Sequence, residues 1–248
     1  MDFLKMRKNN LFFLLITFVI ATSITSCGFT FKTLLGLKNP KVQTKEEIQK
    51  ATEKLNFNAE NGFDLMYVKQ EQDSTYYHIM LSSLDGDLYF FDGEGNRKCY
   101  AGAESCVASQ FVDLKEDFKK QVHDCDLSEA DFGFKFTHLS DLLNQTTNLQ
   151  GEKLGLENLP QTDYYFVYHW SKFAGRNKSK KEDFEWTVER INEMGISYTM
   201  LRVNTDLRTD WGMKKGKRTP LRMKIQKEAN GERSAELNLG TLPKKKSI

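Results

Sequence analysis

The sequence of 248 residues lacks the short motifs that mark most catalytic and cofactor-binding sites. It contains no G-x-S-x-G, Walker, H-E-x-x-H or C-x-x-C pattern, and no pair of carboxylates at a spacing typical of acid–base catalysis. It also shows no internal repeat and no low-complexity tract. These absences argue against the hydrolase, nucleotide-binding and metalloprotease classes. They predict a protein that is not an enzyme and that uses no cofactor and no metal.

The N-terminal part of the sequence lacks an apolar run long enough to span a bilayer. Residues 11–21 are apolar except for Thr17, and eleven residues are too few for a mature transmembrane helix. The run follows Lys5, Arg7 and Lys8 and precedes the small-residue sequence I-T-S-C at 24–27, which is typical of a cleaved secretory signal. The pattern resembles a bacterial lipoprotein signal, and the style of the sequence resembles the lipoproteins of Bacteroidetes-type bacteria. A plain secretory signal is the alternative.

That resemblance implies that Cys27 is lipidated and becomes the mature N-terminus. Acyl chains contribute about 0.8 kcal/mol per buried methylene, so a multiply acylated cysteine would hold the protein firmly on a membrane. We therefore expect a protein of the bacterial cell envelope, by default an outer-membrane lipoprotein, that is attached to the membrane through Cys27. The sequence leaves open which face of the membrane it occupies.

The chain carries little net charge, +2 at neutral pH. Without residues 1–26 it has 33 basic and 33 acidic residues, which argues against a general nucleic-acid binder because such proteins need a broad positive field. The charges are unevenly distributed: residues 28–162 contain 14 basic and 22 acidic side chains, and residues 163–248 contain 19 and 11. The simplest interpretation is that the two parts of one globule attract each other.

Cysteines are few, and only three remain besides Cys27: Cys99, Cys106 and Cys125. In an oxidising envelope the expected arrangement is one disulfide and one buried thiol. We favour Cys99 with Cys106, which flank a Gly-Ala turn, although the spacing does not fix the connectivity. A zinc site that adds His123 has the wrong ligand spacing. A redox role for these cysteines is the alternative that would make the protein an enzyme.

The first half of the mature chain has a mixed pattern. Residues 27–43 are a candidate tether, and residues 44–130 are expected to form an α+β region. Thr44 with Glu47 three positions later predicts the start of a helix over residues 46–55. Residues 63–69, 76–82 and 87–91 are expected to be strands of an antiparallel meander, joined by turns at 85–86 and 92–96. The turn at 92–96 lacks the spaced carboxylates and closing Glu of a calcium loop, so we interpret it as a hairpin turn.

The second region, residues 131–248, is expected to be α/β. A helix is predicted over 114–122, just before it, then a strand over 132–136 and a helix over 139–149. The aromatic and β-branched run at 164–169 indicates a buried strand, 182–194 has a helical period, and 196–203 indicates a second strand parallel to the first. His169 is interpreted as a packed core residue. The pair Asn230-Gly231 predicts a hairpin between 221–227 and 234–239.

The stretch between the first strand and its helix, W-S-K-F-A-G-R-N-K at 170–178, resembles the active-site turn W-x-x-W-C-G-P-C-K of the thioredoxin family. Trp170, Phe173, Gly175 and Lys178 are in place, but Ala174 and Asn177 stand where the family has its two cysteines. Disulfide exchange needs an attacking thiolate and a resolving thiol. The motif therefore predicts a redox-inactive turn.

The resemblance extends over residues 163–240 and implies a thioredoxin-like mixed sheet flanked by helices. It places 164–169 centrally, 197–203 parallel to it, and the hairpin 221–227 with 234–239 in the same four-stranded sheet. Pro220 corresponds to the proline that is cis in that family and that contacts the active-site turn. Two departures are the absence of a helix after the hairpin and the charged segment between Val203 and Pro220.

Two function classes remain open. The first is a redox-inactive binding or scaffolding module, and the alternative is an envelope thiol oxidoreductase that uses Cys99, Cys106 or Cys125. For the first class we predict an anion-attracting edge, to which the N-terminus of the helix contributes. Its partner would be an acidic protein surface, an anionic headgroup, or the acidic first half of this chain. The residues expected there are Arg176, Lys178, Lys214, Lys215, Lys217 and Arg218, together with Lys180.

Overall fold

The computed structural model describes residues 36–57, 62–84, 88–100, 118–125, 136–227 and 233–243. The predicted signal peptide, Cys27, Cys106 and the turns at 85–86 and 230–231 lie outside these residues. The elements, in chain order, are α3 (Lys45–Leu55), β1 (Gly62–Tyr67), α4 (Asp73–Leu81), β2 (Leu88–Asp92), β3 (Arg97–Tyr100), α6 (Phe118–Gln121), β4 (Val122–Asp124), α7 (Leu139–Asn144), β5 (Thr146–Asn148), η1 (Leu156–Asn158), β6 (Tyr164–Trp170), α8 (Asn177–Glu193), β7 (Tyr198–Asn204), η2 (Thr209–Trp211), β8 (Leu221–Lys227) and β9 (Arg233–Leu239).

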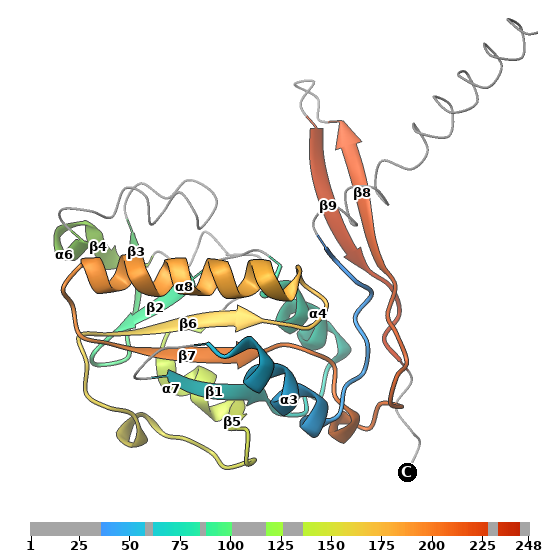
Figure 1. Ribbon diagram of the computed structural model, residues 1–248, viewed down its shortest axis with the longest axis horizontal. Helices are drawn as coiled ribbons and strands as arrows, with labels where there is room; N and C mark the ends of the chain where they lie inside the picture. Colours follow the sequence, from blue (N-terminus) through green and yellow to red (C-terminus); the bar gives the residue numbers. More distant parts are fainter. Residues whose placement is uncertain are drawn as a thin grey trace, which may run out of the picture.

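A mixed sheet of seven strands forms the centre of the molecule, in the order β4-β3-β2-β6-β7-β1-β5. Strands β6, β7 and β1 are parallel to one another, and β2, β3, β4 and β5 pair antiparallel with their neighbours. The carboxyl ends of β6 and β7 point toward the side of the molecule where α3 and the hairpin β8–β9 lie (Figure 1). The expected mixed α/β class and the parallel pairing of β6 with β7 are confirmed.

Helices cover both faces of this sheet because successive strand residues point to opposite sides. On one face, Phe166 packs in a cluster with Ile48 of α3 and Phe184 of α8. On the other face, Val167 packs with residues of α4 and α7, among them Met80. The result is three layers, with α3 and α8 on one side of the sheet and α4 and α7 on the other (Figure 1).

Local signals explain where the helices begin. The Thr44 side chain accepts a hydrogen bond from the backbone N–H of Glu47, and the Glu47 carboxylate accepts one from the backbone N–H of Thr44, which forms a capping box. The predicted first helix is thus confirmed. The long helix α8 starts at Asn177, earlier than the helical period alone indicated, with Arg176 as an extended N-cap.

The predicted antiparallel meander is only partly present. Residues 76–82 were expected to be a strand, but most of them belong to helix α4. Tyr76, Ile79 and Met80 are buried at helical spacing, so packing against the sheet prevails over the β propensity of the aromatic run. Strand β1 is separated from β2 by β6 and β7. The turn at 92–96 does join β2 and β3 as an antiparallel hairpin, as predicted.

Three further predictions differ from the structure in their extent. The helix expected over 139–149 ends at Asn144, because the chain turns at Gln145 and continues as β5, paired with β1. The helix expected over 114–122 is seen as Phe118–Gln121, with residues 114–117 outside the described ranges, and Val122 belongs to β4. Residues 132–135 also lie outside those ranges, and Phe136 is not in a strand.

The predicted position of the C-terminal hairpin is wrong. Strands β8 and β9 pair antiparallel as predicted, with Leu221 opposite Leu239, but they form a separate two-stranded sheet. The place beside β6 that the thioredoxin resemblance assigned to this hairpin is taken by β2. The hairpin instead projects from the body of the molecule (Figure 1).

The peptide bond before Pro220 is trans, so the expected cis proline is also wrong. The backbone N–H of Thr219 donates to the carbonyl of Pro40 at 2.9 Å, and the carbonyl of Pro220 accepts from Gly240 at 2.7 Å. Pro220 therefore begins the projecting hairpin and is held by the segment around Pro40. Nothing in this arrangement requires the tight reversal that a cis proline supplies.

The disulfide joins Cys99 to Cys125, not Cys99 to Cys106. Cys99 lies in β3 and is paired with His123 of the neighbouring strand β4, so Cys125 follows two residues after the partner position. The antiparallel pairing brings the two Cα atoms to 4.9 Å, within the range that a disulfide spans. Strand pairing thus decided a connectivity that spacing along the chain did not reveal.

The last part of the expected tether, residues 36–43, is packed against the body of the molecule. The backbone N–H of Lys38 donates to the carbonyl of Phe173 at 2.8 Å, and that of Val42 donates to the carbonyl of Lys217, also at 2.8 Å. Val42 is fully buried, and Lys41 forms a β-bridge with Arg218. This segment, which we call the N-terminal strap, lies between the turn after β6 and the chain that leads to β8.

Candidate functional site

The turn at residues 170–176 connects the central strand β6 to α8 and is the centre of the candidate site. Ser171 is fully buried, and its Oγ accepts hydrogen bonds from the backbone N–H of Ala174 at 3.1 Å and from the Ser83 hydroxyl at 3.0 Å. Gly175 adopts a left-handed φ of 69°, which favours glycine, before the chain enters α8. The predicted strand, turn and helix are confirmed, and the turn is held by its own hydrogen bonds.

The two positions that correspond to the thioredoxin cysteines lie in different environments. Ala174 is buried and contributes to the apolar core. Asn177 is the exposed first residue of α8. Neither side chain carries a thiol, so this turn has no group able to attack or resolve a disulfide.

The chain just after β7 lies directly beside the turn. Asp206 is 1% exposed, and its Oδ2 accepts hydrogen bonds from the backbone N–H of Lys172 and from Asn204 Nδ2, each at 2.9 Å. Its other oxygen, Oδ1, is buried and has no hydrogen-bond partner. Burial raises the pKa of Asp206, and the hydrogen bonds and the nearby Lys180 and Lys172 oppose that shift.

Lys180 is buried on the inner side of the first turns of α8. Its Nζ donates to the carbonyl of Ser171 at 2.6 Å, so it anchors the turn from below. Burial lowers the pKa of Lys180 to about 8, and attraction to Asp206 limits that decrease. Lys180 was expected on an exposed anion-attracting edge, but it is buried and positions the turn.

A pocket of about 440 Å³ opens between the strap, the turn and the end of β7. Its walls carry four cationic side chains and a single carboxyl group. The lining residues are Leu37, Lys38, Asn39, Lys41, Gln43, Lys172, Phe173, Asp206 and Arg218. It lies at the carboxyl ends of parallel strands, the edge at which open α/β sheets commonly bind ligands.

The structure divides the predicted anion-binding residues into two groups. Arg218 lines the pocket, together with Lys172 of the turn. The others are exposed but lie elsewhere: Lys178 pairs with Glu182 at 3.6 Å along α8, and Lys215 pairs with Glu47 of α3 at 3.4 Å. The strap runs between the turn and residues 217–219, which is why the predicted single cluster is not formed.

The Lys215–Glu47 pair does join the basic and acidic parts of the chain, as the charge asymmetry suggested. Arg176 is exposed at the N-cap of α8, and a Cβ at Gly36 would lie 2.7 Å from its Cγ. The backbone of the strap therefore approaches the turn closely at this point.

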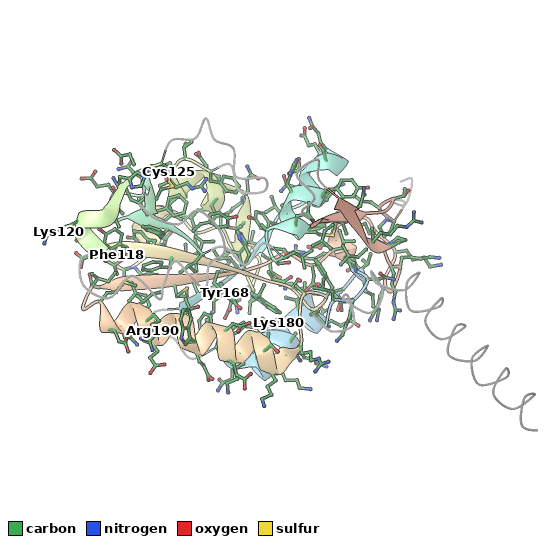
Figure 2. All side chains as sticks on the ribbon, turned by 90° about the horizontal axis from the view of Figure 1, so that it is seen from above. Phe118, Lys120, Cys125, Tyr168, Lys180 and Arg190 are labelled. Atoms are coloured by element: carbon green, nitrogen blue, oxygen red, sulfur yellow. A yellow bond between two sulfur atoms is a disulfide. The ribbon has the colours of Figure 1, made fainter. Side chains whose placement is uncertain are left out.

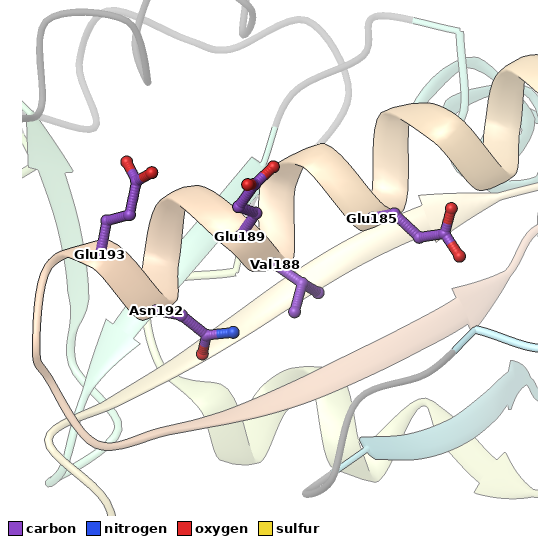
Figure 3. A pocket seen from close by; sticks show the side chains of 5 residues that line it. All are labelled: Glu185, Val188, Glu189, Asn192 and Glu193. Carbon is purple, nitrogen blue, oxygen red and sulfur yellow. The ribbon is translucent and has the colours of Figure 1, made fainter.

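Another hollow lies on the outer face of α8 and is shown in Figure 3. It is lined by Glu185, Val188, Glu189, Asn192 and Glu193. It is a shallow surface away from the turn, and two of its carboxylates are already paired, Glu185 with Lys181 and Glu193 with Arg190. We do not assign it a function.

The disulfide lies in another part of the molecule. Figure 2 shows Cys125 far from Lys180, which marks the start of α8. Cys125 lines a polar pocket of about 450 Å³ with Arg97, Lys98 and Asp124. Of the cysteines in the alternative oxidoreductase hypothesis, the described Cys99 and Cys125 are thus separate from the turn.

Within the described ranges no group of three or more His, Cys, Asp or Glu side chains is arranged to hold a metal ion. The same part of the chain has no helix with the length and apolar character needed to cross a bilayer. His169 is a buried core residue, as expected, with its Nε2 3.1 Å from the Tyr67 hydroxyl. Burial lowers the pKa of His169 to about 3.

Sequence reasoning missed Lys38, Lys41, Lys172 and Asp206 as site residues. The available signal was the N-x-D sequence at 204–206, directly after a buried parallel strand. Polar residues in that position lie at the same edge of the sheet as the turn after β6. The strap lysines carried no such signal, because their place depends on how the strap folds back.

No protein-family model, curated protein or solved structure matches this chain. By its own structure, the molecule is a mixed α/β protein with a cation-lined pocket at the carboxyl edge of its parallel strands.

Proposed function

We propose that this protein is a redox-inactive binding module of the bacterial envelope that holds an acidic or anionic partner on the edge where the turn 170–176 and the basic residues 214–218 flank the strap. The observation that supports it most directly is the turn itself. Its strand, turn and helix resemble those of a thioredoxin active site, it lacks both thiols, and it carries the cationic Lys172 and the exposed Arg176. The resemblance to thioredoxins now rests on the β6–turn–α8–β7 unit, because Pro220 and the hairpin lie outside the sheet.

The electrostatic part of the proposal is tested by binding to a short poly-L-glutamate peptide at increasing salt. Exposed charge pairs weaken as the Debye length decreases, so affinity should fall with salt. Replacing Lys214, Lys215, Lys217 and Arg218 by Ser should weaken binding in the same way. An affinity that is unchanged by salt or by these replacements would contradict the proposal.

The redox part is tested by a disulfide reductase assay on insulin. We expect no activity, and we expect the double variant Ala174→Cys with Asn177→Cys to acquire measurable thiol–disulfide exchange, because Asn177 is at the first position of α8, where a helix N-terminus lowers a thiol pKa. Wild-type activity that survives replacement of Cys99, Cys106 and Cys125 would contradict a redox-inactive turn.

The envelope part of the proposal rests on residues 1–27. We expect mass spectrometry of the mature protein to show an acylated N-terminal Cys27, and Cys27→Ala to release the protein from the membrane fraction. An unmodified mature N-terminus at another residue would instead indicate the plain secretory signal.

A thiol oxidoreductase is the second candidate function, favoured by one observation. The half-buried Cys125 of the disulfide lines a polar surface pocket, so an attacking thiol has access to the bond from this side. Labelling of free thiols before and after mild reduction separates the two candidates. A rapidly reduced Cys99–Cys125 bond with a reactive thiol favours the oxidoreductase, and a bond that resists reduction favours the binding module.

A further inference from the structure

We propose that the pocket between the strap and the turn binds a small phosphate ester that carries a free hydroxyl group. The phosphate would be held by Lys38, Lys41 and Arg218, and the hydroxyl would donate to Asp206. This inference rests on the proposed function, because it names the ligand class of the same edge. It shares Arg218 with that edge, but otherwise it depends on residues of the pocket and not on the exposed lysines at 214–217.

The three cations at the rim are held in place by backbone contacts. Lys41 and Arg218 are partners in an antiparallel β-bridge. The carbonyl of Pro40, the residue before Lys41, accepts a hydrogen bond from the backbone N–H of Thr219. Lys38 is fixed in turn by its backbone hydrogen bond to Phe173. Two separate segments of the chain therefore present their basic side chains to the same pocket without further ordering of the backbone.

These rim cations have no carboxylate partner among the residues that the structure describes. Many other basic side chains of the surface do: Lys178, Lys181, Lys215 and Arg190 are each paired with a glutamate. Three unpaired positive charges around one pocket attract a dianion more strongly than a monoanion, and the guanidinium of Arg218 matches phosphate geometry. The charge of the rim thus favours phosphate over a single carboxylate.

The floor of the pocket supplies the second half of the specificity. Asp206 lines the pocket, is almost completely buried, and has one carboxyl oxygen without a hydrogen-bond partner. Buried polar groups are nearly always paired, and Asp206 lines the pocket, so we assign the missing donor of its unpaired oxygen to the ligand. The phosphate of an ester is attracted by the cationic side chains, and a hydroxyl group on the carbon skeleton of the same molecule supplies the donor to this carboxylate.

The size of the pocket agrees with such a ligand. Its volume of about 440 Å³ lies within the range of small-molecule sites, roughly 300–1,000 Å³. Phe173 contributes an apolar wall against which the carbon skeleton of the ester can pack. Lys172 also lines the pocket, but its Nζ donates to Gln43 Oε1 at 2.8 Å, so this lysine ties the turn to the strap.

The test is calorimetric titration of the purified full-length protein with sn-glycerol 3-phosphate, methyl phosphate and inorganic phosphate. Methyl phosphate has the ester but no hydroxyl group. We expect glycerol 3-phosphate to bind about tenfold more tightly than methyl phosphate, the effect of one hydrogen bond to a charged group. Equal affinities of wild-type protein for the two esters, or no binding of either at millimolar concentration, would overturn the inference.

Variants locate the site. Lys41→Gln and Arg218→Gln should each weaken both esters about five- to tenfold, and Lys178→Gln, a matched change outside the pocket, should have no effect. Asp206→Ala should abolish the preference for glycerol 3-phosphate, with the thermal unfolding midpoint as a check of folding. Asp206→Asn provides a second variant of unchanged shape, and it should reduce the preference because the amide replaces the unpaired acceptor with a donor.

The source of the ester is distinguished by competition. The Cys27→Ala variant is loaded with glycerol 3-phosphate and mixed with lipid vesicles. Displacement of the ester by phosphatidylglycerol vesicles but not by phosphatidylcholine vesicles would assign the site to a lipid headgroup. Failure of both vesicles to compete would assign it to a free phosphate ester. If the wild-type protein binds the ester but not poly-L-glutamate, only the proposed function is overturned. If it binds poly-L-glutamate but neither ester, only the inference about the pocket is overturned.

Discussion

At the scale of single residues, the candidate site depends on polar groups that are buried where parallel strands end. Asp206 caps the turn after β6 by accepting the backbone N–H of Lys172, and Lys180 supports the same turn by donating to the carbonyl of Ser171. Both are nearly inaccessible to solvent. The two side chains carry opposite charges, and the attraction between them partly offsets the free-energy cost of burying them.

Lys180 predicts a dependence of stability on pH. Its pKa is lowered from 10.5 to about 8 in the folded protein, so the unfolded chain binds the proton more tightly. The free energy of unfolding should therefore rise as pH increases from 8 to 10.5, by about 2–3 kcal/mol from this residue. Denaturant unfolding of the wild type and of Lys180→Met at pH 7.5 and 10 measures the difference.

The variant Lys181→Met is the control, because Lys181 is on the partly exposed side of α8 and pairs with Glu185. It should show the same pH dependence as the wild type. A Lys180→Met protein whose stability changes with pH as much as that of the wild type would contradict the buried position of this lysine.

At the scale of elements, the helix starts and the strand pairings follow different rules. The start of α3 is set by two side chains three residues apart, and the sequence predicts it directly. The pairing of β3 with β4 and the position of the hairpin β8–β9 depend on contacts between distant parts of the chain. This difference explains why the first helix was predicted correctly and why the disulfide pairing and the position of the C-terminal hairpin were not.

The capping box of α3 predicts a local stability effect. Thr44→Ala removes the acceptor for the Glu47 backbone N–H and should lower the free energy of unfolding by about 1 kcal/mol. Thr44→Ser keeps the hydroxyl and should retain most of that stability. Chemical denaturation of the three proteins is the measurement, and equal stabilities of the Ala and Ser variants would show that the cap contributes nothing.

The disulfide predicts a larger effect. Cys99 and Cys125 are 26 positions apart, so their bond restricts a sizeable loop of the unfolded chain. Replacing both by Ser should lower the free energy of unfolding by about 3 kcal/mol under oxidising conditions. Cys106→Ser should leave stability unchanged by comparison, and a marked loss in that variant alone would indicate a different pairing.

At the scale of the whole molecule, the strap closes the site and ties the start of the described chain to its end. It contacts the turn at Phe173, the chain after β7 at Leu207 and the segment before β8 at Lys217 and Thr219. One face of the sheet and the strap share a single apolar cluster that includes Val42, Leu207 and Leu242. The pocket exists only because these segments meet.

The strap therefore predicts a global effect of an N-terminal change. Val42→Ala deletes fully buried methyl groups and should lower the free energy of unfolding of the whole molecule by about 1–2 kcal/mol. Lys41→Gln, at the neighbouring half-buried position, should not change it appreciably. Unfolding curves that are identical for the wild type and Val42→Ala would mean that the strap is not part of the cooperative structure.

The sequence by itself determined the elements whose signals are local. The capping box fixed α3, the aromatic run fixed β6 as a buried strand, and the absence of cysteine at 174 and 177 excluded disulfide exchange at the turn. The parallel pairing of β6 with β7 followed as well, because a helix of this length between two strands returns the chain to the same edge of the sheet. These conclusions need only neighbours within one element or one β-α-β unit.

Only the tertiary structure decided which distant segments meet. Tyr76 became helical because its face packs on the sheet, β2 took the place expected for the C-terminal hairpin, and Cys99 found Cys125 through strand pairing. The pocket likewise joins Lys41 to Arg218, more than half the chain apart in sequence. Such contacts depend on the packing of whole surfaces against one another, which is summed over many residues and leaves no signature in any short stretch of the chain.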